Sequence, residues 1–337
     1  MKRLLQNLLF LISMTSLIIG CTIKPNTNKT YINDNIPSNI TKEISDLDNK
    51  IFQAIKSNNP QTISGIFSPK LLENGGDKMD SIFQVTSGIL NGADIKKLND
   101  LYVENATQNV SNTIFSGLTN DDDYIIHYKA LTKNVFISLN RVTIEPNELL
   151  ISLIYGKTSS GWKLYHLQFG TYSLYGKTAV DFYKAGKRYD SLGYIVDAAN
   201  TLFFAQQTLK PGNQLWQYQK EKEIIDLQKS VMDKINRTYK FPYIVDQIET
   251  KPEIYQIYPR AFGDRYETEI RYFSHIDLKD TISLKNENDK LKEVVGDIFK
   301  GIDKDKDFLI YIATNDYPDG GVREIKTYGF VHEFNKE

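Results

Sequence analysis

The chain has 337 residues, of which 41% are hydrophobic and 25% are charged, and its formal net charge is −1. This length allows two or three hydrophobic cores, so we expect a folded protein of several parts. The near-neutral charge excludes the strongly basic surface of a nucleic-acid-binding protein, and nucleic acid is not expected as a partner. Cys21 is the single cysteine, which excludes an internal disulfide.

Residues 1–20 have the pattern of a signal peptide. Lys2 and Arg3 give a basic start, and residues 4–19 are predominantly apolar. A membrane-spanning helix needs about 20 apolar residues. The shorter run found here is followed at once by polar residues, so we expect a cleaved leader rather than a permanent span. An ordinary secretory signal with a chance cysteine and a retained transmembrane helix are the alternatives.

The residues Ile18-Ile19-Gly20-Cys21 resemble the lipobox of bacterial lipoproteins. The resemblance implies cleavage between Gly20 and Cys21 and acylation of Cys21, and two or three acyl chains hold a protein firmly on a bilayer. An Asp after the cysteine retains Gram-negative lipoproteins at the inner membrane. Thr22 in that place implies the outer membrane, with the protein facing the periplasm and an envelope protein as a possible partner.

The residues that follow are expected to form a tether and then helices. Residues 21–40 are rich in Asn, Thr, Pro, Lys and Ser, a composition that cannot bury a core, so they predict the lipidated cysteine and a flexible tether. A first domain is expected at 41–175 and opens with apolar residues at helical spacing. Three helices are expected. The first begins at Thr41 or Ser38, either of which can cap it, and ends at 58–60. The second is expected at 63–67 and the third at 79–90.

The rest of the first domain alternates like β-strands. The expected strands are 113–118, 124–131, 135–144, 149–155 and 162–174. Helices followed by antiparallel strands predict an α+β domain in which the helices cover one face of a curved sheet. This order, ending in residues 150–155 and 161–164, resembles the NTF2-like superfamily. The resemblance implies a pocket in the cone between helices and sheet.

Residues 176–238 are expected to be helical. Small, aromatic and apolar residues recur where a tetratricopeptide repeat that starts at Ala179 has them, and the segment resembles a single repeat. These residues are Phe182, Ala185, Gly186, Tyr189, Gly193, Ala198, Leu202 and Ala205. One repeat cannot bury its own face, so we expect a helical hairpin and a third helix packed on their neighbours. Ile224, Leu227 and Val231 mark the inward face of the third helix.

The C-terminal residues, 239–337, predict a small α+β domain of order ββ(β)αββ. The expected strands are 254–258, 267–273, 276–282, 308–313 and 322–334, and the expected helix is 289–299. We find no family resemblance in this part.

No residue pattern of catalysis or metal binding is present in the sequence. It has no nucleophile elbow, phosphate loop or dinucleotide fingerprint, so no catalytic residue and no cofactor is expected. The histidines have no metal-ligand spacing; they are His127, His166, His275 and His332. Asp303, Asp305 and Asp307 open like a calcium loop, but Phe308 stands where the loop needs Gly. No metal site is therefore expected.

Two groups of residues are candidates for binding. Trp162, Leu164 and His166 alternate along one expected strand, so they are expected to share a face and to line the implied pocket. Six tyrosines gather near the end of the first domain and suit either a binding surface or ordinary packing. They are Tyr165, Tyr172, Tyr175, Tyr183, Tyr189 and Tyr194.

These observations predict a lipid-anchored envelope protein that acts as a non-enzymatic binding or scaffolding module. The first alternative is a small-ligand-binding protein that uses the NTF2-like pocket. The second is an enzyme that uses the same pocket, with His166 as its acid or base.

Overall fold

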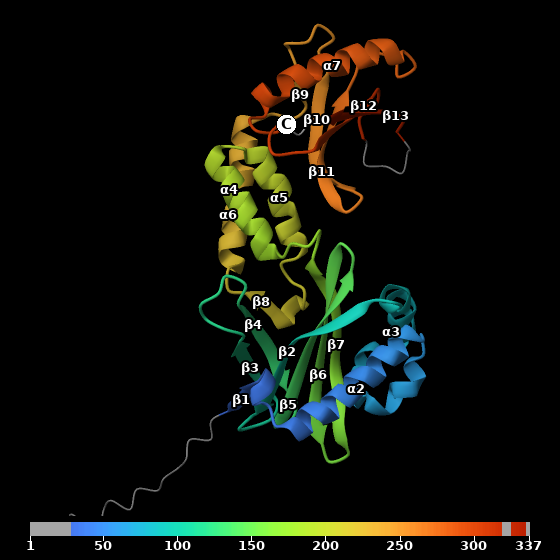
Figure 1. Cartoon of the computed structure of the whole chain (residues 1–337), viewed down its shortest axis with the longest axis vertical. Coiled ribbons are helices and arrows are strands. Elements are labelled where there is room, and N and C mark those ends of the chain that lie inside the picture. Colours follow the sequence, from blue (N-terminus) through green and yellow to red (C-terminus); the bar gives the residue numbers. More distant parts are fainter. Residues whose placement is uncertain (1–27, 319–324, 335–337) are drawn as a thin grey trace, which may run out of the picture.

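The chain folds as a mixed α+β protein whose parts follow one another along the long axis of the molecule (Figure 1). This computed structural model describes residues 28–318 and 325–334. One end holds a sheet flanked by two long helices, the middle is helical, and the other end holds a second sheet with one helix (Figure 1). The α+β class predicted from the sequence is confirmed.

The first unit is built on an antiparallel sheet of strand order β1-β2-β5-β6-β7. Its elements are β1 Lys29–Ile32, η1 Asn33–Asn35, α2 Ser38–Lys56, η2 Pro60–Ile66, α3 Pro69–Leu90, β2 Asp94–Glu104, β5 Asn134–Ile144, β6 Asn147–Thr158 and β7 Gly161–Ser173. Phe136 of β5 packs in the cluster formed with α2 and α3, while its neighbour Ile137 packs in the cluster on the opposite face. Both side chains are fully buried, so both faces of this sheet are covered.

A buried polar network joins α2 to β2, β5 and β6. The carboxylate of Asp48 accepts hydrogen bonds from Ser138 Oγ at 2.5 Å and from Tyr155 Oη at 2.6 Å, and it pairs with Lys97 Nζ at 2.8 Å. A buried carboxylate is tolerated when its oxygens are paired in this way. The network explains why β2, which the sequence pattern did not indicate, is a strand despite its polar residues.

The flexible tether expected at 21–40 extends too far along the chain, because its last part is folded. Residues 29–32 pair antiparallel with residues 101–104 of β2, and α2 begins at Ser38. The ring of Tyr31 stacks on that of Tyr102 with the centroids 5.6 Å apart. The strand was missed because four residues in a polar stretch are too short for their alternation to be recognised.

A small three-stranded sheet covers the other face of the first sheet, and the helical segment lies beyond it along the long axis (Figure 1). These elements are β3 Val110–Phe115, β4 Tyr124–Ala130, α4 Ala179–Leu192, α5 Ile195–Gln207, η3 Asn213–Leu215, β8 Trp216–Tyr218 and α6 Glu221–Thr238. β8 pairs with β4, so the helical segment donates a strand to the first unit. Trp216 is 1% exposed, and its ring stacks on that of Tyr124 at a centroid distance of 3.6 Å. A single hydrophobic cluster therefore crosses the expected boundary at residue 175.

The hairpin of α4 and α5 packs closely at one glycine. A Cβ on Gly186 of α4 would lie 2.8 Å from Leu202 Cγ of α5, so only glycine allows this approach. Thr178 and Asp181 form a capping box at the start of α4. Gly193 ends the helix in the left-handed conformation, with φ +77°.

The C-terminal unit is a mixed sheet of order β13-β12-β11-β10-β9. Its elements are β9 Tyr243–Ile244, β10 Glu253–Phe262, β11 Arg265–Phe273, α7 Thr281–Ile298, β12 Phe308–Thr314 and β13 Thr327–Glu333. α7 is the crossover between the parallel strands β11 and β12. The strand expected at 276–282 is wrong, because Asp280 caps α7 by accepting a hydrogen bond from the Ser283 amide at 3.1 Å. The helix expected at 289–299 therefore begins eight residues earlier.

Candidate functional site

The predicted anchor residues Gly20 and Cys21 lie outside the described residues. Within the part of the chain that is described, no helix combines the length and the hydrophobicity that a membrane crossing requires. Over the same residues, no group of three or more His, Cys, Asp or Glu side chains is placed to hold a metal ion.

The expected pocket residues Trp162, Leu164 and His166 do not share a face. Trp162 and Leu164 are buried in the cluster that packs against α2 and α3. A β-bulge follows, since Tyr155 pairs with Leu164 while its neighbour Ile154 pairs with His166. The extra residue, Tyr165, reverses the alternation of β7. His166 therefore lines a cavity on the face opposite the helices.

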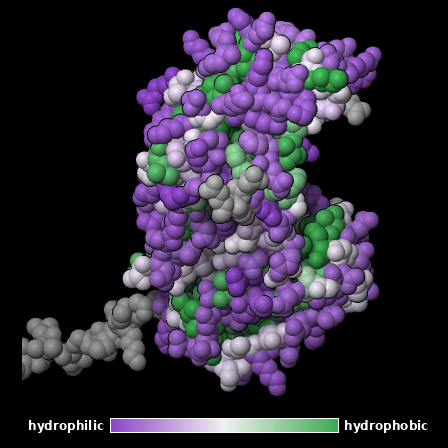
Figure 2. All heavy atoms as spheres, turned by 45° about the horizontal axis from the view of Figure 1, so that its top comes forward, coloured by the Kyte–Doolittle hydropathy of each residue, from purple (hydrophilic) through white to green (hydrophobic). Residues whose placement is uncertain are grey.

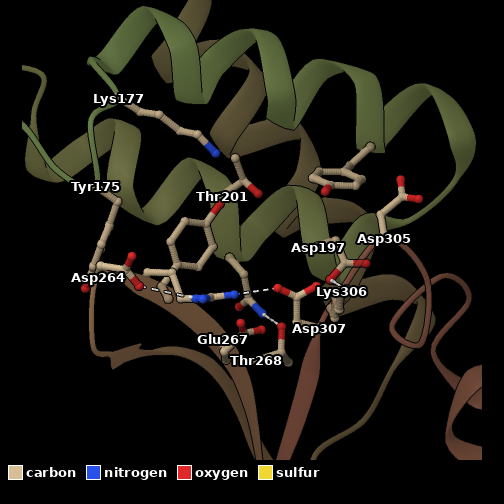
Figure 3. Close-up of a pocket in the computed structure, with 14 residues that line it drawn as sticks. Tyr175, Lys177, Asp197, Thr201, Asp264, Glu267, Thr268, Asp305, Lys306 and Asp307 are labelled. Carbon is tan, nitrogen blue, oxygen red and sulfur yellow. Dashed lines mark hydrogen bonds and ion pairs between the residues drawn. The ribbon is translucent and has the colours of Figure 1, made fainter. Parts of the chain in front are cut away.

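A cleft with a charged lining lies where the helical hairpin meets the C-terminal unit. Its volume is about 290 Å³. Figure 3 shows its polar side chains coming from the helices on one side and from the strands and loops of the C-terminal sheet on the other. We refer to it as the junction cleft.

Carboxylates outnumber cations in the lining of the junction cleft. The carboxylates are Asp197, Asp264, Glu267, Asp305 and Asp307. The cations are Lys177, Arg265 and Lys306. Three tyrosines complete the walls; they are Tyr175, Tyr189 and Tyr266. The lining is therefore both acidic and aromatic.

Asp197 is the most deeply buried charge of the cleft. It lies in the first turn of α5, where the helix dipole favours an anion. Its Oδ1 pairs with Lys306 Nζ at 2.7 Å, and the two side chains are only 5% and 10% exposed. Its Oδ2 has no hydrogen-bond partner among the described residues. Burial raises the pKa of Asp197, and the charge of Lys306 opposes that rise.

The strand side of the cleft carries a second buried carboxylate. Burial raises the pKa of Glu267, and the nearby charge of Asp307 adds to the effect. Arg265 pairs with Asp307 at 2.5 Å and with Asp264 at 3.4 Å, so this cation is already neutralised. Thr268 accepts a hydrogen bond from Asn200 of α5 at 3.4 Å, which ties the strand to the helix.

Aromatic rings wall the cleft on the side of the connection between β7 and α4. The ring centroids of Tyr175 and Tyr266 are 5.5 Å apart, and Tyr266 lies 4.4 Å from Phe204. The ammonium group of Lys177 lies 5.9 Å from the centroid of Tyr266. Burial raises the pKa of Tyr266 to about 12, so its hydroxyl stays protonated at neutral pH.

The sequence indicated only part of this cleft. Tyr175 and Tyr189 belong to the predicted tyrosine group, and both line it. Asp305 and Asp307 were noticed for their calcium-like spacing, and the structure pairs them with Arg188 at 3.2 Å and Arg265 at 2.5 Å. Nothing in the sequence indicated that Asp197 belongs to a site, apart from its position in the first turn of an apolar helix.

No protein-family model matches the chain, and no curated protein or solved structure matches it. The likenesses inferred from the sequence therefore remain expectations, and the function has to be inferred from the geometry of the sites themselves.

Proposed function

We propose that this chain is a lipid-anchored binding protein of the bacterial cell envelope, held in the outer membrane through Cys21 and facing the periplasm. It works by binding rather than by catalysis, and its ligand site is the junction cleft. The observation that carries the proposal is the buried carboxylate of Asp197, whose second oxygen has no partner among the described residues and which lies in an acid-rich, tyrosine-walled cleft.

The chemistry of the cleft favours a ligand with an amine or guanidinium group. A buried carboxylate oxygen without a hydrogen-bond partner raises the free energy of the folded protein, and a bound cation that pairs with this oxygen removes that penalty. Tyr175, Tyr189 and Tyr266 line the same cleft, and aromatic rings add cation–π attraction to a bound cation. The surface in the view of Figure 2 is largely hydrophilic, with its hydrophobic residues in separate groups, which suits a polar ligand better than a broad apolar partner.

The resemblances inferred from the sequence support a scaffold of this kind. The packing of α2 and α3 on one face of an antiparallel sheet is the arrangement that the NTF2-like resemblance implies. The close approach at Gly186 has the small residue that a tetratricopeptide hairpin uses. Trp162 and Leu164 are packed under the helices, so the junction cleft is a better ligand site than the cone pocket.

The ligand site is tested with the full chain in mild detergent by calorimetric titration with spermidine and with arginine methyl ester. We expect saturable binding that Asp197→Asn weakens by about tenfold or more, the worth of a charge-assisted hydrogen bond. Asp246→Asn is the matched control, since Asp246 is 75% exposed and lies outside the cleft lining. Equal binding by both variants, or no binding of either cation, would refute the cleft as a cation site.

The anchor is tested by mass spectrometry of the natural protein and by labelling cells with an alkyne fatty acid. We expect a diacylated or triacylated Cys21 at the new N-terminus, and no label on the Cys21→Ser variant. An unmodified thiol at Cys21, or a chain that still carries residues 1–20, would contradict the lipid anchor.

A further inference from the structure

A second cavity lies beside the part of the first sheet where Ile154 pairs with His166, and Lys70 at the start of α3 also contributes to its lining. Its volume is about 530 Å³, within the range of small-molecule sites. β4, β7 and the turn before β8 contribute to its walls. We refer to it as the histidine cavity, after His127 and His166, which line it together with Lys70, Lys129, Tyr128 and Tyr165.

The charge of this cavity is opposite to that of the junction cleft. Among the described residues that line it, none is Asp or Glu, while two lysines, two histidines and several hydroxyl and amide groups are present. Lys70 and Lys129 are exposed, so their ammonium groups can turn toward a ligand. The apolar part of the lining is supplied by Ile154, Leu131 and Leu215.

His166 lines this cavity, and its ring has a buried nitrogen without a hydrogen-bond partner among the described residues. The bulge at Tyr165 places His166 on the cavity face, opposite Ile154. Its Nε2 is buried and has no hydrogen-bond partner among residues 28–318 and 325–334. Burial lowers the pKa of His166, which keeps the imidazole neutral at neutral pH. A buried ring nitrogen without a hydrogen-bond partner raises the free energy of the folded protein. A ligand that hydrogen-bonds to this nitrogen therefore binds more tightly.

His127, which also lines the cavity, is held in place by two side-chain contacts. Its Nε2 lies 2.8 Å from Gln217 Oε1, and its Nδ1 lies 3.4 Å from Thr113 Oγ1. Gln217 belongs to β8, so the strand that the helical segment donates also orients a wall of the cavity. The site is thus preorganised by contacts between distant parts of the chain.

We infer that the histidine cavity is a second ligand site, which takes a small organic anion, a carboxylate or phosphate group attached to an apolar or aromatic body. Lys70 and Lys129 attract the anionic group, and Nε2 of His166 bonds to a polar atom of the ligand. Tyr128, Tyr165 and Ile154 pack against the body. This site is separate from the junction cleft, and its ligand differs in charge from the cation proposed there.

The proposal is tested on the full chain in mild detergent by NMR of the imidazole groups, since the chain has only four histidines. Phenyl phosphate and benzoate are the probes. We expect a saturable shift of the His166 and His127 signals with at least one probe and none at His275 or His332. A response to phenyl phosphate alone assigns a phosphate ligand, and a response to benzoate alone assigns a carboxylate.

Charge variants complete the test. Lys129→Gln is expected to raise the dissociation constant of the responding probe by about fivefold, which corresponds to the upper end of the free energy that an exposed ion pair contributes. Lys222→Gln is the control, because the Lys222 side chain is 86% exposed and lies outside the cavity lining. The proposal is overturned if neither probe shifts His166, if His275 shifts equally, or if the two lysine variants bind alike.

Discussion

Trp216 joins the helical segment to the first unit through its buried ring, which stacks on Tyr124. We expect Trp216→Ala to lower the free energy of unfolding by about 4 kcal/mol. Burying roughly 200 Å² of a tryptophan at about 25 cal/mol per Å² is worth about 5 kcal/mol, and large-to-small changes of aromatic residues in cores cost about 3–5 kcal/mol. The indole Nε1 has no hydrogen-bond partner among the described residues, so the loss is one of packing and of the stack on Tyr124.

The assay is urea unfolding of the full chain in mild detergent, followed by far-UV circular dichroism. With a slope of about 3 kcal/mol per molar urea, a loss of 4 kcal/mol lowers the midpoint by about 1.3 M. Phe203→Ala is the matched control, since Phe203 is 46% exposed, and it should change the stability by less than about 0.5 kcal/mol. Equal midpoints for the two variants would refute the role assigned to Trp216.

Two further predictions concern Gly186 and His166. Gly186→Val should cost about 1–3 kcal/mol by overpacking, since its Cβ would meet Leu202 Cγ at 2.8 Å, whereas Gly88→Ala, in open space, should not destabilise α3. Thermal unfolding measures both, and equal melting temperatures would contradict the close approach. Burial lowers the folded-state pKa of His166 below 6.5, so the unfolded chain binds more protons and stability falls as the pH drops through about 6.5. His166→Gln should flatten that decline between about pH 7 and 5, and an unchanged slope in urea midpoints would argue against it.

The sequence was sufficient to predict four strands of the first unit, three in its large sheet and one in the small sheet. β4, β5, β6 and β7 lie close to their predicted ranges, because each is a long run of β-branched and aromatic residues. β1 and β8 were missed because strands of four and three residues are too short to show a period. β2 was missed because Lys97 and Asp100 interrupt its hydrophobic pattern. Lys97 pairs with both Asp48 and Asp100, and these contacts exist only in the folded chain.

The two cavities were harder to predict from the sequence than the strands were. Alternation placed His166 beside Trp162 and Leu164, but one extra residue in β7 moved it to the opposite face. Bulges leave no reliable mark in a single sequence. Asp197 lies far along the chain from Lys306 and Glu267, so its burial follows from the docking of helix on sheet and not from any local pattern.

The donated strand β8 also sets an order on folding during synthesis. Gln217, beside His127 in the finished sheet, follows it by 90 residues in the chain. At about 5–20 residues per second, the ribosome needs about 5–20 s to make that stretch. Throughout this interval the edge of β4 lies open and the ring of Tyr124 lacks its cover, so the nascent chain passes through a stage in which it is vulnerable to pairing with other chains.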